Sequence, residues 1–209
     1  GSRAMAERRG GVPAPECDTS IVGEDWYGRD LSGQTFERTL FVDVDMTEAT
    51  SAGAVFRECS FRGVKFNASR HEESAFLNCT FTACNFFDTR FVGAKLIGSM
   101  FDRCEFALLQ VEGGDWSFVG FPGATLEGAG FVGVRMREVD LTFAKCARAT
   151  LSHCDLSASW FHGADLSETT LTGSDLAGLD PVETVLKGAY IDEHQAVQLA
   201  EAMGLRVIA

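Results

Sequence analysis

Hydrophobic residues recur at every fifth position of this chain. The stretch from Phe161 to Gly178 repeats a unit made of a small residue, Asp or Thr, Leu, Ser or Thr, and Gly. Extended from Ile21 to Ile191, this frame holds 35 central positions, and only Ser51, His71 and Pro181 are neither apolar nor Cys. A period of five matches neither the 3.6 of a helix nor the 2.0 of a strand. It predicts a solenoid built from short repeats.

A second position, two residues before each central residue, holds small side chains. From position 19 to position 189, 30 of 35 such residues are Ala, Cys, Gly, Ser, Thr or Val. The five exceptions are Glu24, Arg29, Gln34, Leu109 and Leu179. Gly stands two residues after the centre fifteen times, where a corner favours positive φ. One large and one small residue per side then fill a square coil of about twenty residues, and coils stack at roughly 4.8 Å.

Particular positions predict how the solenoid is filled and where it ends. Phe recurs at 41, 61, 81, 101 and 121 and should form one stacked column. His71 occupies a central position, and we interpret it as a core irregularity rather than a site. Trp26 and Tyr27 are expected to cover the open end of the first coil, which spans residues 17–36. Pro181 should end a coil, because proline cannot donate to a strand ladder.

Both ends of the chain depart from the repeat. Residues 1–16 lack it and are expected to be a disordered extension, with Gly1 and Ser2 resembling a tag remnant. Residues 17–191 form the predicted β-solenoid. Residues 192–209 contain a helix, with Asp192 as N-cap and Gln195 at the third helical position. Its apolar residues, with one that follows the helix, are Ala196, Leu199, Ala200, Met203 and Leu205. They would either cover the end of the solenoid or join two subunits end to end, and we favour the second.

The net charge of −12 is concentrated in the second half. Residues 1–104 hold 12 Lys and Arg against 15 Asp and Glu, whereas residues 105–209 hold 6 against 15. Six acids and no Lys or Arg fall between Ala149 and Leu186. At the strand spacing that is roughly one charge per 1.5 Å of axis, close to the value of about 1.7 Å for duplex DNA.

A twenty-residue coil would sort the acids of the second half into two groups on opposite sides. The 115 column contains Asp115, Asp155 and Asp175, interrupted by Arg135. The 105 column contains Glu105, Glu127, Asp165 and Glu168. The alternative interpretation is a solvated acidic surface that only aids solubility.

Several classes of function are disfavoured. None of the four His residues pairs with a nucleophile in a recognisable motif, and no phosphate-binding glycine loop carries a Lys. We therefore expect no enzyme activity, no metal and no cofactor. Excess acid disfavours direct nucleic-acid binding. Six of the seven Cys fall in inward positions, which predicts free thiols and a cytoplasmic protein, and no apolar run is long enough for a membrane span.

The tandem motif of a small residue, Asp, Leu, Ser or Thr and Gly resembles the pentapeptide repeat family over residues 17–191. The resemblance implies an all-β solenoid, a right-handed quadrilateral β-helix, with a short C-terminal helix. Residues 69–81, the unbroken frame and residues 191–197 resemble fluoroquinolone-resistance proteins of the MfpA type more than the loop-bearing Qnr type.

This resemblance implies a DNA mimic that occupies the DNA-binding saddle of DNA gyrase, with topoisomerase IV as a second candidate, and protects it from fluoroquinolones or other poisons. The acids of the 105 and 115 columns would face gyrase, and the apolar C-terminal residues named above would form a homodimer. Basic residues in the middle of the chain confine the mimicry to the C-terminal half: Arg57, Arg62, Lys65, Arg70, Arg90 and Lys95. The alternative is a scaffold module that binds another protein and has no role at gyrase.

Overall fold

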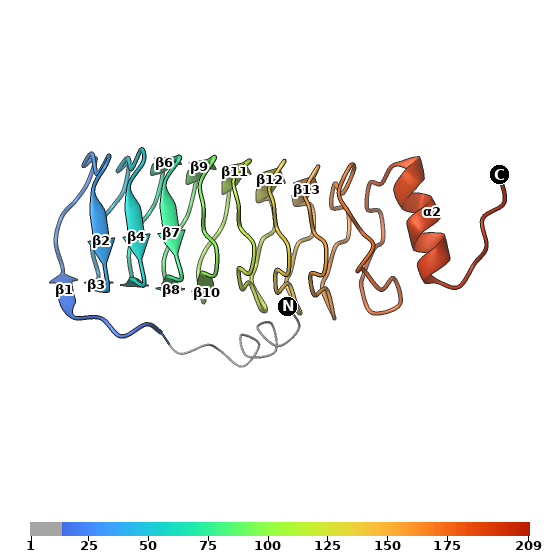
Figure 1. Cartoon of the computed structure of the whole chain (residues 1–209), viewed down its shortest axis with the longest axis horizontal. Helices are drawn as coiled ribbons and strands as arrows, with labels where there is room; N and C mark the ends of the chain where they lie inside the picture. Colours follow the sequence, from blue (N-terminus) through green and yellow to red (C-terminus); the bar gives the residue numbers. More distant parts are fainter. Residues whose placement is uncertain (1–13) are drawn as a thin grey trace.

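The computed structural model describes residues 14–209 and shows coils stacked along one axis, with a helix at the C-terminal end (Figure 1). The sides of the coils carry strands of three or four residues. In chain order these are β1 (Thr19–Val22), β2 (Thr35–Glu37), β3 (Thr39–Val42), β4 (Val55–Arg57), β5 (Ser60–Arg62), β6 (Arg70–Glu72), β7 (Ala75–Leu77), β8 (Thr80–Thr82), β9 (Arg90–Val92), β10 (Met100–Asp102), β11 (Gln110–Glu112), β12 (Gly130–Val132) and β13 (Thr150–Ser152), followed by helix α2 (Glu193–Ala202).

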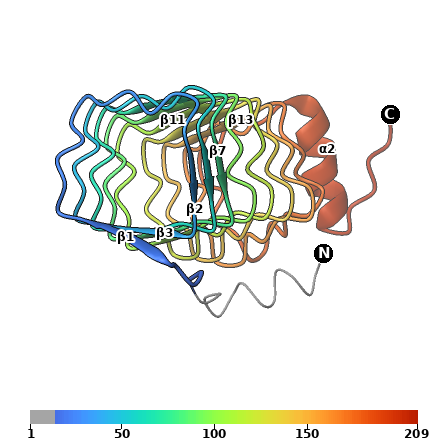
Figure 2. The same cartoon turned by 60° about the vertical axis from the view of Figure 1, so that its left-hand side comes forward.

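Every strand pairs in parallel with a strand twenty residues away. The strands form three sheets, ordered β1-β3-β5-β8-β10, β13-β12-β11-β9-β6 and β2-β4-β7. Isolated β-bridges continue the same twenty-residue register beyond the strands, and the last of them joins Thr170 to Tyr190. The turned view in Figure 2 shows the successive coils superimposed along the axis. The predicted solenoid with a twenty-residue coil is therefore confirmed.

Large central residues fill the interior. In the predicted phenylalanine column, neighbouring rings from Phe41 to Phe121 stack with centroids 4.8 Å apart and interplanar angles of at most 11°. Each of these rings is at most 4% exposed. Since 4.8 Å is also the strand spacing, the backbone ladder sets the ring separation. The column is core, as the sequence predicted.

The small inward position accepts hydroxyl and thiol groups because it faces a carbonyl of the preceding coil. Thr89 Oγ1, Ser99 Oγ and Ser174 Oγ donate to carbonyl oxygens 23 residues earlier, at 2.6 to 2.8 Å. The thiols of Cys79 and Cys84 donate in the same way at 3.4 Å. These hydroxyl and thiol groups are thus paired although they are buried, and all seven Cys are free thiols.

The corners have positive φ, as the glycine spacing predicted, at fourteen of the fifteen predicted glycines. The exception is Gly178. Near it, Gly163 N bonds to Glu183 O, twenty residues on, whereas Gly123 N bonds to an oxygen nineteen residues on. The hydrogen bonding therefore shifts by one residue beside Pro181, whereas the twenty-residue register is the same before and after it. The prediction that a coil ends there is wrong, since the ladder resumes where Asp165 pairs with Val185.

Trp26 closes the first coil. It is 5% exposed, packs on Phe36 and Phe41, and donates from Nε1 to Glu24 at 2.9 Å. The Arg29 guanidinium lies 4.6 Å from its ring centroid. Glu24 and Arg29 thus break the small-residue rule because they contact the capping indole. Tyr27 is 58% exposed, so the prediction that it also covers the open end of the first coil is wrong.

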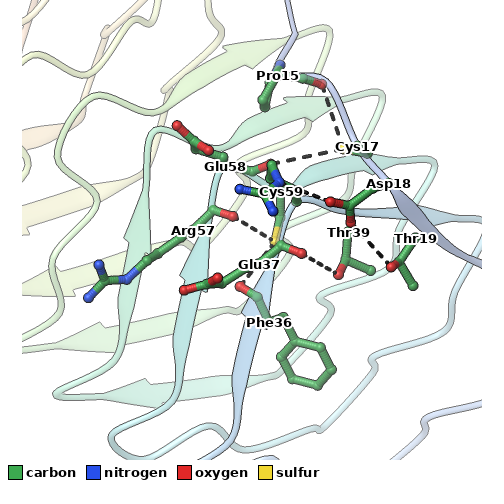
Figure 3. Close-up of polar contacts among 11 residues, drawn as sticks. Pro15, Cys17, Asp18, Thr19, Phe36, Glu37, Thr39, Arg57, Glu58 and Cys59 are labelled. Atoms are coloured by element: carbon green, nitrogen blue, oxygen red, sulfur yellow. Dashed lines mark hydrogen bonds and ion pairs between the residues drawn. The ribbon is translucent and has the colours of Figure 1, made fainter.

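The first described residues lie along the second and third coils. Cys17 donates its thiol to the Pro15 and Glu58 carbonyls, and Asp18 pairs with Arg38 at 3.0 Å (Figure 3). Of the predicted extension 1–16, residues 1–13 lie outside the described part of the chain.

Helix α2 covers the other end of the solenoid. Asp192 and Gln195 form the predicted capping box. The Gln195 side chain is also buried and donates from Nε2 to the carbonyls of Leu171 and Ser174, which otherwise end the stack. No helix within residues 14–209 has the length and apolar character that a membrane crossing needs.

Candidate protein-binding surfaces

The seven predicted acidic residues lie on two opposite sides of the solenoid. The 115 column runs through backbone bridges that join Asp115 to Arg135 and Arg135 to Asp155. The 105 column runs through a bridge from Lys145 to Asp165. Positions 105 and 115 differ by half a coil, which is two of the four sides, so they lie on opposite sides of the solenoid. The structure confirms the columns, but it does not bring all seven carboxylates onto one face.

Basic side chains interrupt both columns. Arg148 contacts Glu127 and lies 3.3 Å from Glu168, and Arg137 lies 4.0 Å from Asp155. These pairs are about half exposed, so each adds little stability, but each removes an uncompensated negative charge from the surface. Counting acids along the sequence missed this pairing. The twenty-residue spacing between Arg148 and Glu168 could have revealed it.

Four of the predicted aspartates also have a structural role. Asp115, Asp155, Asp165 and Asp175 each accept, at Oδ1, the backbone N–H two residues later, at 2.9 to 3.1 Å. Side-chain and backbone hydrogen bonds from Ser167 hold the pKa of Asp165 below its usual value. Such bonds stabilise tight turns, and a neutral amide can make them as well.

The same turn bond occurs where no partner surface is predicted. Asp30 and Asp45 make it in the first half, and Asn85 makes it to Phe87 N at 2.9 Å. An acid at this position is therefore sufficiently explained by turn formation. The sequence analysis did not identify this role.

An uncompensated acidic segment remains next to α2. Of the six acids between residues 149 and 186, Asp155 and Glu168 pair with Arg, and Glu183 lies 3.1 Å from His162. Among the described residues, Asp165, Asp175 and Asp180 form no ion pair. Arg side chains thus compensate two of the six charges, which reduces the DNA-like charge density expected from the sequence to about two thirds.

The predicted dimer residues divide into two sets. Leu199 packs against the core and Ala200 is half-buried. Ala196 is exposed, and Met203 and Leu205 are 60% and 58% exposed. The final residues extend beyond the helix and away from the body (Figure 1). Helix α2 therefore covers the solenoid end and also leaves apolar surface free in the single chain.

Two family models match the sequence. "Pentapeptide repeat region" matches residues 54–131, and "Pentapeptide repeats (8 copies)" matches residues 121–157. No curated protein matches this chain.

Similar solved structures include QnrB1, described as a plasmid-mediated fluoroquinolone resistance protein. One trypsin-treated QnrB1 variant is 22% identical with a TM-score of 0.52, covering 93% of this chain and 99% of that one. A second is 23% identical with a TM-score of 0.46, covering 94% of each chain. HetL from the cyanobacterium Nostoc, described as a pentapeptide repeat protein involved in heterocyst differentiation regulation, is 18% identical with a TM-score of 0.31 and coverages of 91% and 94%.

At these identities the structural likeness concerns the fold. Together with the five-residue period, the twenty-residue coil and the two sequence matches, it shows that the chain belongs to the pentapeptide repeat family.

Proposed function

We propose that this protein binds DNA gyrase as a DNA mimic and protects the enzyme from fluoroquinolones. The observation that carries the proposal is a filled, straight-sided rod with an uncompensated acidic segment at one end. QnrB1, which shares the fold, is described as a fluoroquinolone resistance protein. A cationic DNA-binding surface would accept an acidic rod by electrostatic complementarity and release counterions as it does with DNA.

Dimerisation through α2 would strengthen this mimicry. The acidic segment adjoins α2, so two chains joined at this end would bring their Asp165, Asp175 and Asp180 residues to the centre of a longer rod. The basic residues of the middle coils would then lie toward the two outer arms. This arrangement keeps mimicry at the centre of the dimer despite the pairing by Arg137 and Arg148.

The test compares two triple variants of equal charge change. One carries Asp155→Asn, Asp165→Asn and Asp175→Asn, and the matched control carries Asp25→Asn, Asp30→Asn and Asp45→Asn. Because Asn85 already makes the turn bond, asparagine should preserve the fold in both. Purified gyrase is assayed for supercoiling and for fluoroquinolone-induced DNA cleavage.

The native protein should reduce cleavage, the control should act like it, and the C-terminal triple variant should lose most of the effect. Raising salt should weaken the native effect steeply. Absence of any effect of the native protein on gyrase, or equal potency of the two variants, would contradict the proposal.

A second candidate function is that of a scaffold, favoured by the apolar surface at the C-terminal end. Val207 and Ile208, which follow Met203 and Leu205 in the chain, are also exposed, by 48% and 91%. A scaffold would use this surface to bind a protein other than gyrase. Light scattering of Met203→Ser/Leu205→Ser against native protein tests whether the surface joins two chains of 22.6 kDa. A dimer that leaves gyrase unaffected would favour the scaffold.

A further inference from the structure

A pocket outside the acidic columns opens on a third side of the solenoid. Its volume is about 420 Å³, and its lining spans three successive coils. The lining residues are Pro122, Gly123, Asp140, Thr142, Phe143 and His162. This volume falls within the usual range for small-molecule sites.

The wall of this pocket contains a buried carboxylate. Asp140 is 0% exposed, and its Oδ1 accepts the turn bond from Thr142 N at 2.9 Å. Its Oδ2 has no hydrogen-bond partner, and the buried Thr142 Oγ1 has none either. No Lys or Arg of the described chain forms an ion pair with Asp140. Leaving such atoms unpaired inside a protein is costly.

An exposed aromatic ring stands at the mouth. Phe143 is 60% exposed and has φ of +56°, at a corner where the coils before and after carry Gly123 and Gly163. Bulky residues rarely adopt this conformation. A Cβ on Gly163 would overlap the Phe143 ring, so the glycine leaves room for it. The ring packs edge-on against His162, with centroids 5.3 Å apart.

We infer that this pocket binds a primary ammonium group carried on an apolar stem. Asp140 Oδ2 and Thr142 Oγ1 would accept its hydrogen bonds, and Phe143 would add a cation–π contact. Glu183, paired with His162 at 3.1 Å, adds negative charge nearby. The ammonium supplies both the charge and the donors that the buried atoms lack. The group can belong to a small amine or to the lysine side chain of a partner protein.

The first experiment titrates the ¹⁵N-labelled full chain with benzylammonium and with its neutral analogue, benzyl alcohol. Benzylammonium should shift the amide signals of Thr142, Phe143 and His162, with a dissociation constant on the order of 1 mM for so small a ligand. Benzyl alcohol should bind at least about tenfold more weakly, because a hydrogen bond between charged groups is stronger than a neutral one. Nα-acetyl-lysine amide tests the lysine source. Tighter binding than benzylammonium would assign the site to a partner's side chain, and weaker binding to a small amine.

Two variants separate binding from folding. Asp140→Asn keeps the turn bond and removes the charge, so it should weaken benzylammonium about tenfold or more. Without ligand it should also melt at a temperature equal to or above that of the native protein, because an uncompensated buried charge has been removed. Asp45→Asn, at a turn aspartate on another side of the rod, is the matched control and should bind normally.

Phe143→Gly places at this corner the residue found in the adjacent coils, so it should fold and bind benzylammonium several-fold more weakly. Equal binding of the amine and the alcohol, no shift at these amides with any amine, or undiminished binding by Asp140→Asn would each overturn the inference.

Discussion

Replacing His71 by Phe should remove a pH-dependent loss of stability. His71 is 2% exposed, stacks on Phe91 at 4.8 Å, and lies between the hydroxyls of Ser51 and Ser69. Burial lowers the pKa of this imidazole from 6.5 to about 3. The ring is therefore neutral in the folded protein throughout the accessible pH range.

The magnitude follows from proton linkage. Above pH 6.5 the ring is neutral in both states and contributes no pH dependence. Below pH 6.5 the unfolded chain binds a proton that the folded chain excludes until about pH 3, so the free energy of unfolding falls by about 1.4 kcal/mol per pH unit. Between pH 6.5 and pH 5, His71 alone should cost about 2 kcal/mol.

The Phe variant should lack this loss without leaving new polar groups unpaired. Ser51 Oγ keeps its bond with Ser74 at 2.9 Å, and Ser69 Oγ keeps the Phe66 carbonyl at 2.6 Å. Urea unfolding of both proteins at pH 7.5, 6.0 and 5.0 measures the difference, in which contributions of the other titrating groups cancel. Parallel pH profiles, or an NMR titration of His71 near pH 6.5, would refute the reasoning.

Three further predictions concern the core, the end of the solenoid and the thiols. Phe81→Ala should lower the free energy of unfolding by about 3 to 5 kcal/mol, whereas Phe87→Ala, at a ring that is 45% exposed, should cost far less; urea unfolding compares them. Gln195→Ala should cost about 1 to 3 kcal/mol by the same assay, because two buried carbonyls lose their donor, and an unchanged midpoint would show that water replaces it. In the native protein a maleimide should label Cys17 quickly and Cys154 only after unfolding, because burial raises the pKa of the Cys154 thiol to about 11; mass spectrometry after brief exposure would detect early Cys154 labelling if this is wrong.

The fold could be predicted because the repeat is local and uninterrupted. Each five-residue unit specifies one side of a coil, and stacking repeats the same contacts, so one short pattern fixes the register from Thr19 to Tyr190. The prediction failed at Pro181, where the sequence departs from the repeat at a single position. Near Pro181 the hydrogen bonding shifts by one residue and then returns to register, and this depends on how the neighbouring coils pack there.

The candidate site was less predictable, because charge pairing depends on where long side chains reach. Counting acids correctly located an excess near the C-terminus, but Arg148 extends across a coil boundary to Glu127 and Glu168. The pocket beside Asp140 gave no signal in the sequence, since Asp at that position looks the same whether exposed or buried.

The sequence by itself determined the solenoid, its filled phenylalanine core, its corners and its capped C-terminal helix, because each follows from residues close together in a repeating frame. Only the tertiary structure decided which carboxylates are neutralised, that Gln195 closes the stack, and that Asp140 is buried without a partner. These depend on side chains from different coils meeting in space, and a five-residue pattern does not specify such contacts.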